Sequence, residues 1–124
     1  MNVKFDTKEK FHVITPQEHS LSVNMTEEMR SLLLSCLEKP EKNVVLSLKE
    51  VAELDEQTAT MLAELQQEFY DNKASFVICE LKPNVEQWLD EKELLEVMNV
   101  TPTESEAWDI VQMEEIEREL LGDE

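Results

Sequence analysis

Two short apolar runs constrain the fold of this 124-residue chain most strongly. They lie at residues 43–48 (Asn-Val-Val-Leu-Ser-Leu) and 75–81 (Ser-Phe-Val-Ile-Cys-Glu-Leu), and each has the length and composition of a strand buried on both faces. The segment between them carries apolar residues at helical spacing, which are Met61, Leu62, Leu65 and Phe69. Strands that alternate with helices require right-handed crossovers and a mostly parallel sheet. The sequence therefore predicts an α/β fold.

The first part of the chain adds a pair of strands and a helix. Residues 3–5 and 11–14 are short apolar stretches separated by polar residues, which is typical of two paired strands, and this pair is expected to supply one antiparallel strand. Asn24 and Glu27 have the spacing of a capping pair ahead of an apolar stripe. They predict a helix that starts there and ends near Pro40.

The second part contains further start and stop signals. Asp55 is expected to cap the helix between the two buried runs, and Asn72 to end it in the left-handed conformation that glycine usually adopts. Pro83 predicts the first turn of a short helix, because proline suits that position. Residues 94–100 predict a last short strand.

An acidic helix is predicted at residues 104–121, after a capping box formed by Thr103 and Glu106. Its broad apolar stripe consists of Ala107, Ile110, Val111, Met113, Ile116, Leu120 and Leu121. Residues 104–124 hold 9 acidic residues and one basic residue, so the outer face is either simply solvated or attracts a basic partner. Together the elements predict one domain, residues 1–124, with a sheet of four or five strands and about four flanking helices.

The net charge of −18 restricts the partners that such a chain can bind. Residues 1–62 hold 7 basic and 11 acidic residues, whereas residues 63–124 hold 4 and 18. Nucleic acids and anionic lipids are not expected as partners, because proteins bind them through basic patches. The sequence also has no signal peptide and no apolar stretch of transmembrane length, so we expect a cytoplasmic protein without direct membrane insertion.

No catalytic site is predicted. The single glycine, Gly122, lies near the end of the chain, which excludes glycine-rich phosphate loops and nucleophile elbows. His12 and His19 have no ligand or catalytic partner at a suitable spacing, and Cys36 and Cys79 have no basic neighbour, so these thiols are expected in the core. We therefore expect no enzyme activity, no metal and no cofactor. Trp88 and Trp108 are both placed on apolar helix faces, where burial is more common than exposure, and one of them remains open as an anchor at an interface.

The order and spacing of several segments resemble the STAS domain, the family of sulfate transporters and anti-sigma factor antagonists. The resemblance covers roughly residues 3–115 and depends on residues 43–51 (Asn-Val-Val-Leu-Ser-Leu-Lys-Glu-Val), Asp55 at a helix start and residues 75–85 with their proline-started helix. The stretch 94–100 followed by residues 103–107 is similar to the last strand and final helix of the family. The resemblance implies a STAS-like fold.

The same resemblance implies a partner-binding loop. In phosphorylatable members the loop reads Asp-Ser-Ser/Thr-Gly, and the first serine is phosphorylated by a partner anti-sigma kinase. The matching positions here are Asp55, Glu56, Gln57 and Thr58. Glu56 replaces the acceptor serine, so either it imitates the phosphoserine or the switch has been lost, and we favour the loss. It remains open whether Thr58 or Thr60 accepts the phosphate in place of the missing serine.

The sequence thus predicts a non-catalytic regulatory module. It resembles an anti-sigma factor antagonist that binds a serine-kinase-type anti-sigma factor through residues 53–63, in which Met61 follows the loop. The alternative is a cytoplasmic STAS subunit of a lipid or anion transporter assembly. Self-association is a further open possibility.

Overall fold

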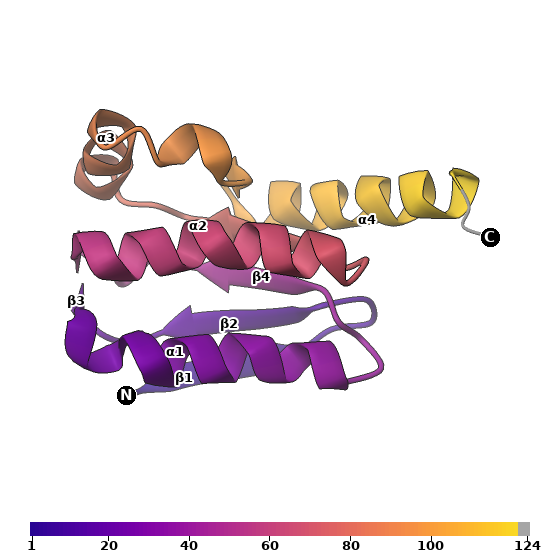
Figure 1. Ribbon diagram of the computed structural model, residues 1–124, viewed down its shortest axis with the longest axis horizontal. Helices are drawn as coiled ribbons and strands as arrows, with labels where there is room; N and C mark the ends of the chain where they lie inside the picture. The colour runs from indigo at the N-terminus through magenta and orange to yellow at the C-terminus, as the bar shows by residue number, and fades with distance from the viewer. Residues whose placement is uncertain (122–124) are drawn as a thin grey trace.

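The structure, a computed structural model, describes residues 1–121. Its central feature is a five-stranded sheet in the order β1-β2-β4-β6-β7, and a two-stranded ribbon, β3-β5, lies apart from it (Figure 1). The strands are β1 (Val3–Thr7), β2 (His12–Pro16), β3 (Ser20–Leu21), β4 (Val44–Ser47), β5 (Glu53–Leu54), β6 (Phe76–Cys79) and β7 (Val100–Thr101). The helices are α1 (Val23–Ser35), α2 (Glu56–Asp71), α3 (Pro83–Glu91) and α4 (Glu104–Leu120), with short 3-10 turns at Cys36–Glu38 and Leu95–Val97.

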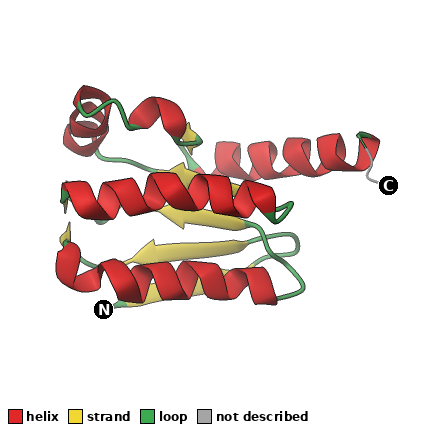
Figure 2. Ribbon diagram, in the orientation of Figure 1, coloured by secondary structure: helices red, strands yellow, loops and turns green. Residues whose placement is uncertain are grey.

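The sheet confirms the predicted mixed α/β class. Strand β1 is antiparallel to β2, with Phe5 opposite Ile14, whereas β2, β4, β6 and β7 pair in parallel. The two apolar runs that anchored the prediction form β4 and β6 at the centre of the sheet, and every residue of both strands is buried. Helical crossovers between these parallel strands place layers of helix against the sheet (Figure 2).

The two faces of the sheet are covered by different helices. One hydrophobic cluster contains β-strand side chains such as Ile14, Leu46 and Ile78 together with residues of α1, α2 and α3. The other contains Val45 and Val77 with two residues of α4. Because neighbouring residues of a strand point to opposite faces, the alternation of Val44, Val45 and Leu46 divides β4 between the two clusters.

The expected cap of α1 is wrong. The helix begins at Val23, with Ser22 in extended conformation (φ −123°) before it, so that Asn24 and Glu27 both lie within the first turns. The reason is tertiary: Leu21 pairs with Leu54 in the β3-β5 ribbon, which holds the chain extended up to that point and fixes where α1 can begin. This ribbon was not predicted, because two residues per strand carry no measurable periodicity.

The expected terminator of α2 is also wrong. Asn72 has φ −98°, and the left-handed conformation is adopted by Lys73, with φ 60°. The Asn72 side chain instead donates to the Glu68 carbonyl oxygen at 2.8 Å, which satisfies a carbonyl at the helix end. Glu80 and Glu93 adopt the same conformation, so three turns that usually contain glycine are formed without it.

The predicted last strand is much shorter than expected. The segment 94–100 contains a 3-10 turn, and strand β7 consists of Val100 and Thr101. Leu94, Leu95 and Met98 pack against the larger core cluster, and this spacing of three to four residues suits a helical turn better than a strand.

Helix α4 begins as predicted and then departs from the prediction. Thr103 Oγ1 accepts a hydrogen bond from the Glu106 amide at 3.2 Å, which confirms the cap. Ala107 and Val111 are its buried residues, but the later part of the expected stripe faces solvent, because the apolar contacts of α4 with the sheet come from its first half and its second half approaches the sheet with polar side chains. The exposed apolar side chains are Trp108, Met113, Ile116, Leu120 and Leu121. The expected burial of Trp108 is therefore wrong, whereas Trp88 is partly buried against the core.

Within residues 1–121, no helix combines the length and the apolar character needed to cross a bilayer.

Candidate functional site

The start of helix α2 is positioned by the small ribbon that precedes it. Strand β5 pairs with β3, and the Asp55 amide donates to the Leu21 carbonyl oxygen at 3.2 Å, so the chain leaves the ribbon at a fixed point. Asp55 then caps the helix, because its Oδ1 accepts from the Thr58 amide at 2.9 Å. The helix start therefore lies at one end of the molecule, close to β3 (Figure 1).

The Asp55 carboxylate is held in its charged form. Burial raises its pKa, but hydrogen bonds from the Thr58 amide, the Thr58 hydroxyl and the Val23 amide outweigh this effect and bring the pKa of Asp55 below its usual value of 3.8. The amide dipoles at the helix start favour the same charge. At neutral pH this end of α2 thus carries a fixed negative group.

Glu56 projects from the first turn of α2 into solvent. Its side chain is 70% exposed, and Oε1 lies 3.7 Å from Nζ of Lys92, the residue that follows α3. An ion pair with this exposure contributes little to stability. Glu56 is consequently a surface charge that the core does not require.

The two threonines that remained open as acceptors have different environments. Thr58 is buried, and its hydroxyl is hydrogen-bonded to the Thr26 hydroxyl of α1 at 3.0 Å. Thr60 is exposed and lines a shallow groove of about 580 Å³ between α1 and α2. A kinase could reach Thr60 at the surface, whereas access to Thr58 requires α1 and α2 to separate.

The groove also shows where Gln57 and Met61 lie. Gln57 is exposed beside Glu56, as a partner contact requires. Met61 is only 4% exposed and belongs to the larger core cluster, so it forms the floor of the groove more than its rim. This burial agrees with the apolar stripe of α2, to which Met61 also belongs, and leaves little of its side chain for direct contact with a partner.

Other residues near the helix start were not found from the sequence. Arg30 of α1 lines the groove and pairs with Glu68 at 3.3 Å. On the other side of Asp55, Trp88 and Asn84 of α3 border a second hollow, in which Asn84 Nδ2 donates to the Ala52 carbonyl oxygen at 2.9 Å. These residues come from separate helices, so no sequence spacing connects them to Asp55.

The surface around the start of α2 is mainly anionic. Its carboxylates come from the ribbon, the cap and both helices that border the groove: Glu27, Glu53, Asp55, Glu56 and Glu64. Arg30 and Lys92 are the cations next to them. This arrangement suits contacts with basic side chains of another protein.

The histidines and cysteines do not form a reactive centre here. The buried His12 ring is hydrogen-bonded through Nδ1 to the Thr7 hydroxyl at 3.0 Å and through Nε2 to the Glu41 carbonyl oxygen at 2.7 Å. Burial raises the pKa of both thiols, that of Cys79 to about 12, which keeps them protonated. In the described part of the chain, no group of three or more His, Cys, Asp or Glu residues is arranged to hold a metal ion.

Comparisons with known proteins agree with this architecture. A family model described as STAS domain matches residues 2–107. An anti-sigma-factor antagonist (STAS) domain protein from Planctomyces limnophilus has a similar structure, with a TM-score of 0.74 at 17% identity over 89% of this chain and 97% of that chain. No curated protein matches by sequence.

Two further solved structures are similar. The unphosphorylated anti-sigma factor antagonist SpoIIAA has a TM-score of 0.71 at 15% identity, and the match covers 90% of this chain and 96% of that one. The murine Slc26a9 anion transporter has a TM-score of 0.68 at 14% identity over 84% of this chain, which corresponds to 18% of the transporter. At these identities the similarity establishes the fold.

Proposed function

We propose that this chain, which belongs to the STAS domain family, is a non-catalytic regulatory module that binds a protein partner through residues 53–63. The observation that carries the proposal is the start of α2: a capped, well-positioned helix end that presents exposed acidic and polar side chains the core does not use. Such a surface has no strained or reactive group for chemistry, but it has the fixed shape and charge that recognition needs.

The family resemblance suggests the kind of partner. We propose a serine-kinase-type anti-sigma factor, or a regulator similar to one, which would contact Asp55, Glu56 and Gln57 through basic residues. A phosphate at a helix start carries about −1.5 to −2 charges, whereas a glutamate carries one charge and two oxygens. Glu56 is therefore an incomplete imitation of phosphoserine, and the proposal is that phosphorylation no longer switches this surface.

The experiment that tests the docking surface compares two charge reversals at opposite ends of the molecule. Glu56→Arg changes the start of α2, and Glu38→Arg changes an exposed residue that follows α1. Tagged proteins are recovered from the source cells with their partners, which are quantified by mass spectrometry. A partner lost with Glu56→Arg and retained with Glu38→Arg supports the proposal, and a partner retained equally by both contradicts it.

The recovered partner also separates the two candidate roles. An anti-sigma factor or another sigma regulator supports the regulatory proposal. Permease or ATPase subunits instead support the alternative, a STAS subunit in a transporter assembly, for which the fold similarity to the Slc26a9 transporter is the specific observation.

The loss of the switch has its own test. Phosphopeptide mapping of the protein from its own cells is expected to find residues 55–60 unmodified. Phosphate on the exposed Thr60 that disappears in Thr60→Ala would show that the acceptor has moved by four positions and would contradict a lost switch.

A further inference from the structure

Helix α4 has two apolar faces. Ala107 and Val111 face the sheet, as expected for a helix that covers it. Met113, Ile116 and Leu120 follow one another at intervals of three and four residues, which places them on a common face that points away from the sheet. Met113 and Ile116 are each 55% exposed and Leu120 is 80% exposed.

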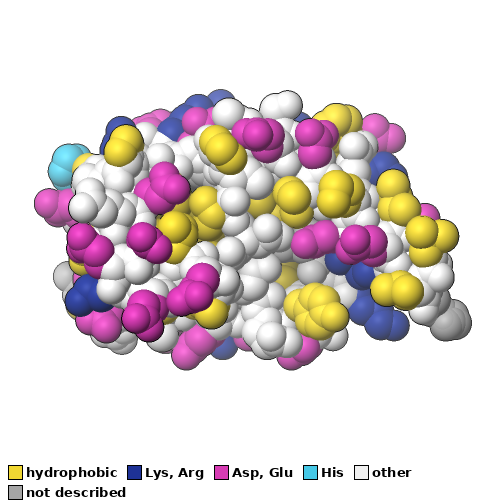
Figure 3. Space-filling model, turned by 90° about the horizontal axis from the view of Figure 1, so that it is seen from above, with side chains coloured by type: hydrophobic (Ala, Val, Ile, Leu, Met, Phe, Trp, Pro, Cys, Tyr) yellow, Lys and Arg dark blue, Asp and Glu magenta, His cyan; other side chains and the backbone are white. Residues whose placement is uncertain are grey.

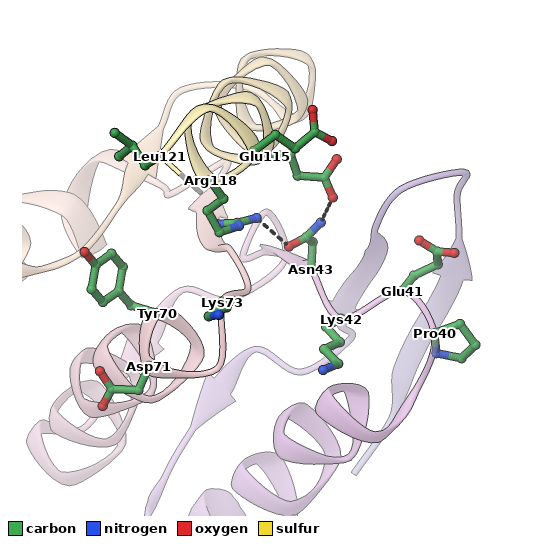
Figure 4. A pocket seen from close by; sticks show the side chains of 11 residues that line it. Pro40, Glu41, Lys42, Asn43, Tyr70, Asp71, Lys73, Glu115, Arg118 and Leu121 are labelled. Carbon is green, nitrogen blue, oxygen red and sulfur yellow. Dashed lines mark hydrogen bonds between the residues drawn. The ribbon is translucent and has the colours of Figure 1, made fainter. Parts of the chain in front are cut away.

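Polar contacts prevent α4 from turning this outer face inward. Glu114 Oε1 accepts from the Ser75 hydroxyl at 2.5 Å, and Glu115 Oε2 accepts from Nδ2 of Asn43 at 2.6 Å. Arg118 donates to both the Ser75 hydroxyl and Oδ1 of Asn43, at 3.2 and 3.4 Å. Figure 4 shows Glu115 and Arg118 converging on Asn43 from α4. These contacts fix the rotation of the helix, so the outer apolar residues stay in solvent.

The outer face is bordered by carboxylates. Asp109, Glu117 and Glu119 are exposed on α4, and the single base of this helix, Arg118, is used in the contacts with Ser75 and Asn43. Two copies of α4 placed face to face would bring these carboxylates together, in a chain whose net charge is already −18. Like charges at an interface disfavour that pairing, whereas lysine or arginine on a partner would complement it.

We propose that the outer face of α4, formed by Met113, Ile116 and Leu120, binds an amphipathic helix of a partner protein whose apolar stripe is flanked by lysine and arginine. The spacing of the three residues matches the repeat through which helices pack side by side. In Figure 3, exposed hydrophobic side chains are visible at the end of the molecule where α4 ends. The end of α4 and the start of α2 lie at opposite ends of the protein (Figure 1), so this surface is additional to the one at residues 53–63.

The test uses the full chain and a synthetic helical peptide with leucine at positions i, i+3 and i+7 and lysine on both flanks. Binding is measured by fluorescence anisotropy at low and high salt. The double variant Ile116→Ser/Leu120→Ser is expected to bind at least about tenfold more weakly, because it removes the centre of the apolar face. The matched control is Val97→Ser, since Val97 is 54% exposed and lies outside α4.

A second variant tests the charge without removing any apolar side chain. Glu117→Gln/Glu119→Gln is expected to weaken binding and to flatten its salt dependence. A peptide with glutamate in place of lysine should bind poorly. Glu56→Arg should leave peptide binding unchanged, so this proposal and the one for residues 53–63 can fail separately.

Several results would overturn the inference. They are the absence of saturable peptide binding, a loss of affinity in Val97→Ser equal to that in Ile116→Ser/Leu120→Ser, and binding of the glutamate peptide as tight as that of the lysine peptide. Sedimentation could also show a dimer of the parent protein that is absent in Ile116→Ser/Leu120→Ser. This result would assign the face to a second copy of the chain and would contradict a basic partner.

Discussion

Helices α2 and α4 are similar in length and charge but differ in how they pack. They contain 16 and 17 residues, both are acidic and amphipathic, and both begin at a side-chain cap, Asp55 or Thr103. Six residues of α2 are buried, whereas α4 buries two. The difference arises because α2 packs against both the sheet and the neighbouring α1, whereas the apolar contacts of α4 with the sheet come from its first half. An apolar stripe in a sequence therefore predicts an amphipathic helix without showing how much of the stripe belongs to the core.

The two proposed surfaces also differ in the chemistry that they present to a partner. The start of α2 is polar and anionic, with its apolar residue Met61 withdrawn into the core. The outer face of α4 is apolar with an anionic border. The first surface suits recognition by charge and hydrogen bonds, and the second suits recognition by apolar burial.

The largest expected difference between the two helices concerns a leucine in each. Leu65 of α2 is fully buried, so Leu65→Ala is expected to lower the free energy of unfolding by about 2–5 kcal/mol. Leu120 of α4 is 80% exposed, so Leu120→Ala should change the free energy of unfolding by less than about 0.5 kcal/mol. Urea denaturation measures both variants. Equal losses would show that the end of α4 is part of the core.

The contacts that hold α4 in place can be broken at Asn43. Asn43→Ala removes the acceptor of the Ser75 amide and the donor to Glu115, and it is expected to cost about 1–3 kcal/mol because the buried amide and the partly buried carboxylate lose their partner. Hydrogen exchange in α4 should accelerate in the same variant. The control is Asn24→Ala on the exposed part of α1, which is expected within about 0.5 kcal/mol of the parent protein. A larger decrease in the free energy of unfolding of Asn24→Ala would show that Asn24 does cap α1.

The caps of the two helices should contribute similarly. Asp55→Ala and Thr103→Ala are each expected to lower the free energy of unfolding by about 1 kcal/mol, because each leaves a helix amide without its acceptor. Thermal and urea unfolding provide the values. A loss confined to one variant would show that the other cap is formed without contributing to stability.

The charge of Asp55 adds a dependence on pH. Its pKa is lower in the folded protein than its ordinary value of 3.8, so the unfolded chain takes up the proton first as the pH falls. The stability that this charge contributes is therefore present above pH 3.8 and is lost as the pH falls through the pKa of Asp55 in the folded protein. Asp55→Asn keeps a side-chain acceptor, and its stability difference from the parent protein should shrink over that range. A difference that grows at acidic pH would contradict the direction of the shift.

The smallest expected effect concerns the end of α2. Lys73 has a left-handed backbone, which glycine adopts at lower cost, so Lys73→Gly should stabilise the protein by about 0.5 kcal/mol. Asp71→Gly, within the helix, should destabilise it by about 1 kcal/mol. If both glycines destabilise, the φ of Lys73 does not strain the chain.

The parts of the fold that local patterns determine were predicted correctly. The runs at β4 and β6, the caps at Asp55 and Thr103, and the proline start of α3 each depend on a few neighbouring residues. These patterns also gave the right sheet class, because strands that alternate with helices have few possible arrangements.

The errors occur where distant segments decide the outcome. The β3-β5 ribbon moved the start of α1, and core packing of Leu94 and Met98 replaced most of a predicted strand with a turn. At the proposed site, the sequence predicted the cap, the exposed glutamate and the apolar stripe that includes the buried Met61, but not the neighbouring Arg30 of α1 and Asn84 of α3. These differences depend on which helices pack together, which one sequence does not specify locally.

A partner that binds the start of α2 is the central element of the proposed function. Hydrogen exchange of the protein, free and in complex with the co-purified partner, tests this claim directly. We expect slower exchange at residues 53–63 in the complex and no such complex with Glu56→Arg. A stable complex in which exchange at residues 53–63 is unchanged would contradict it.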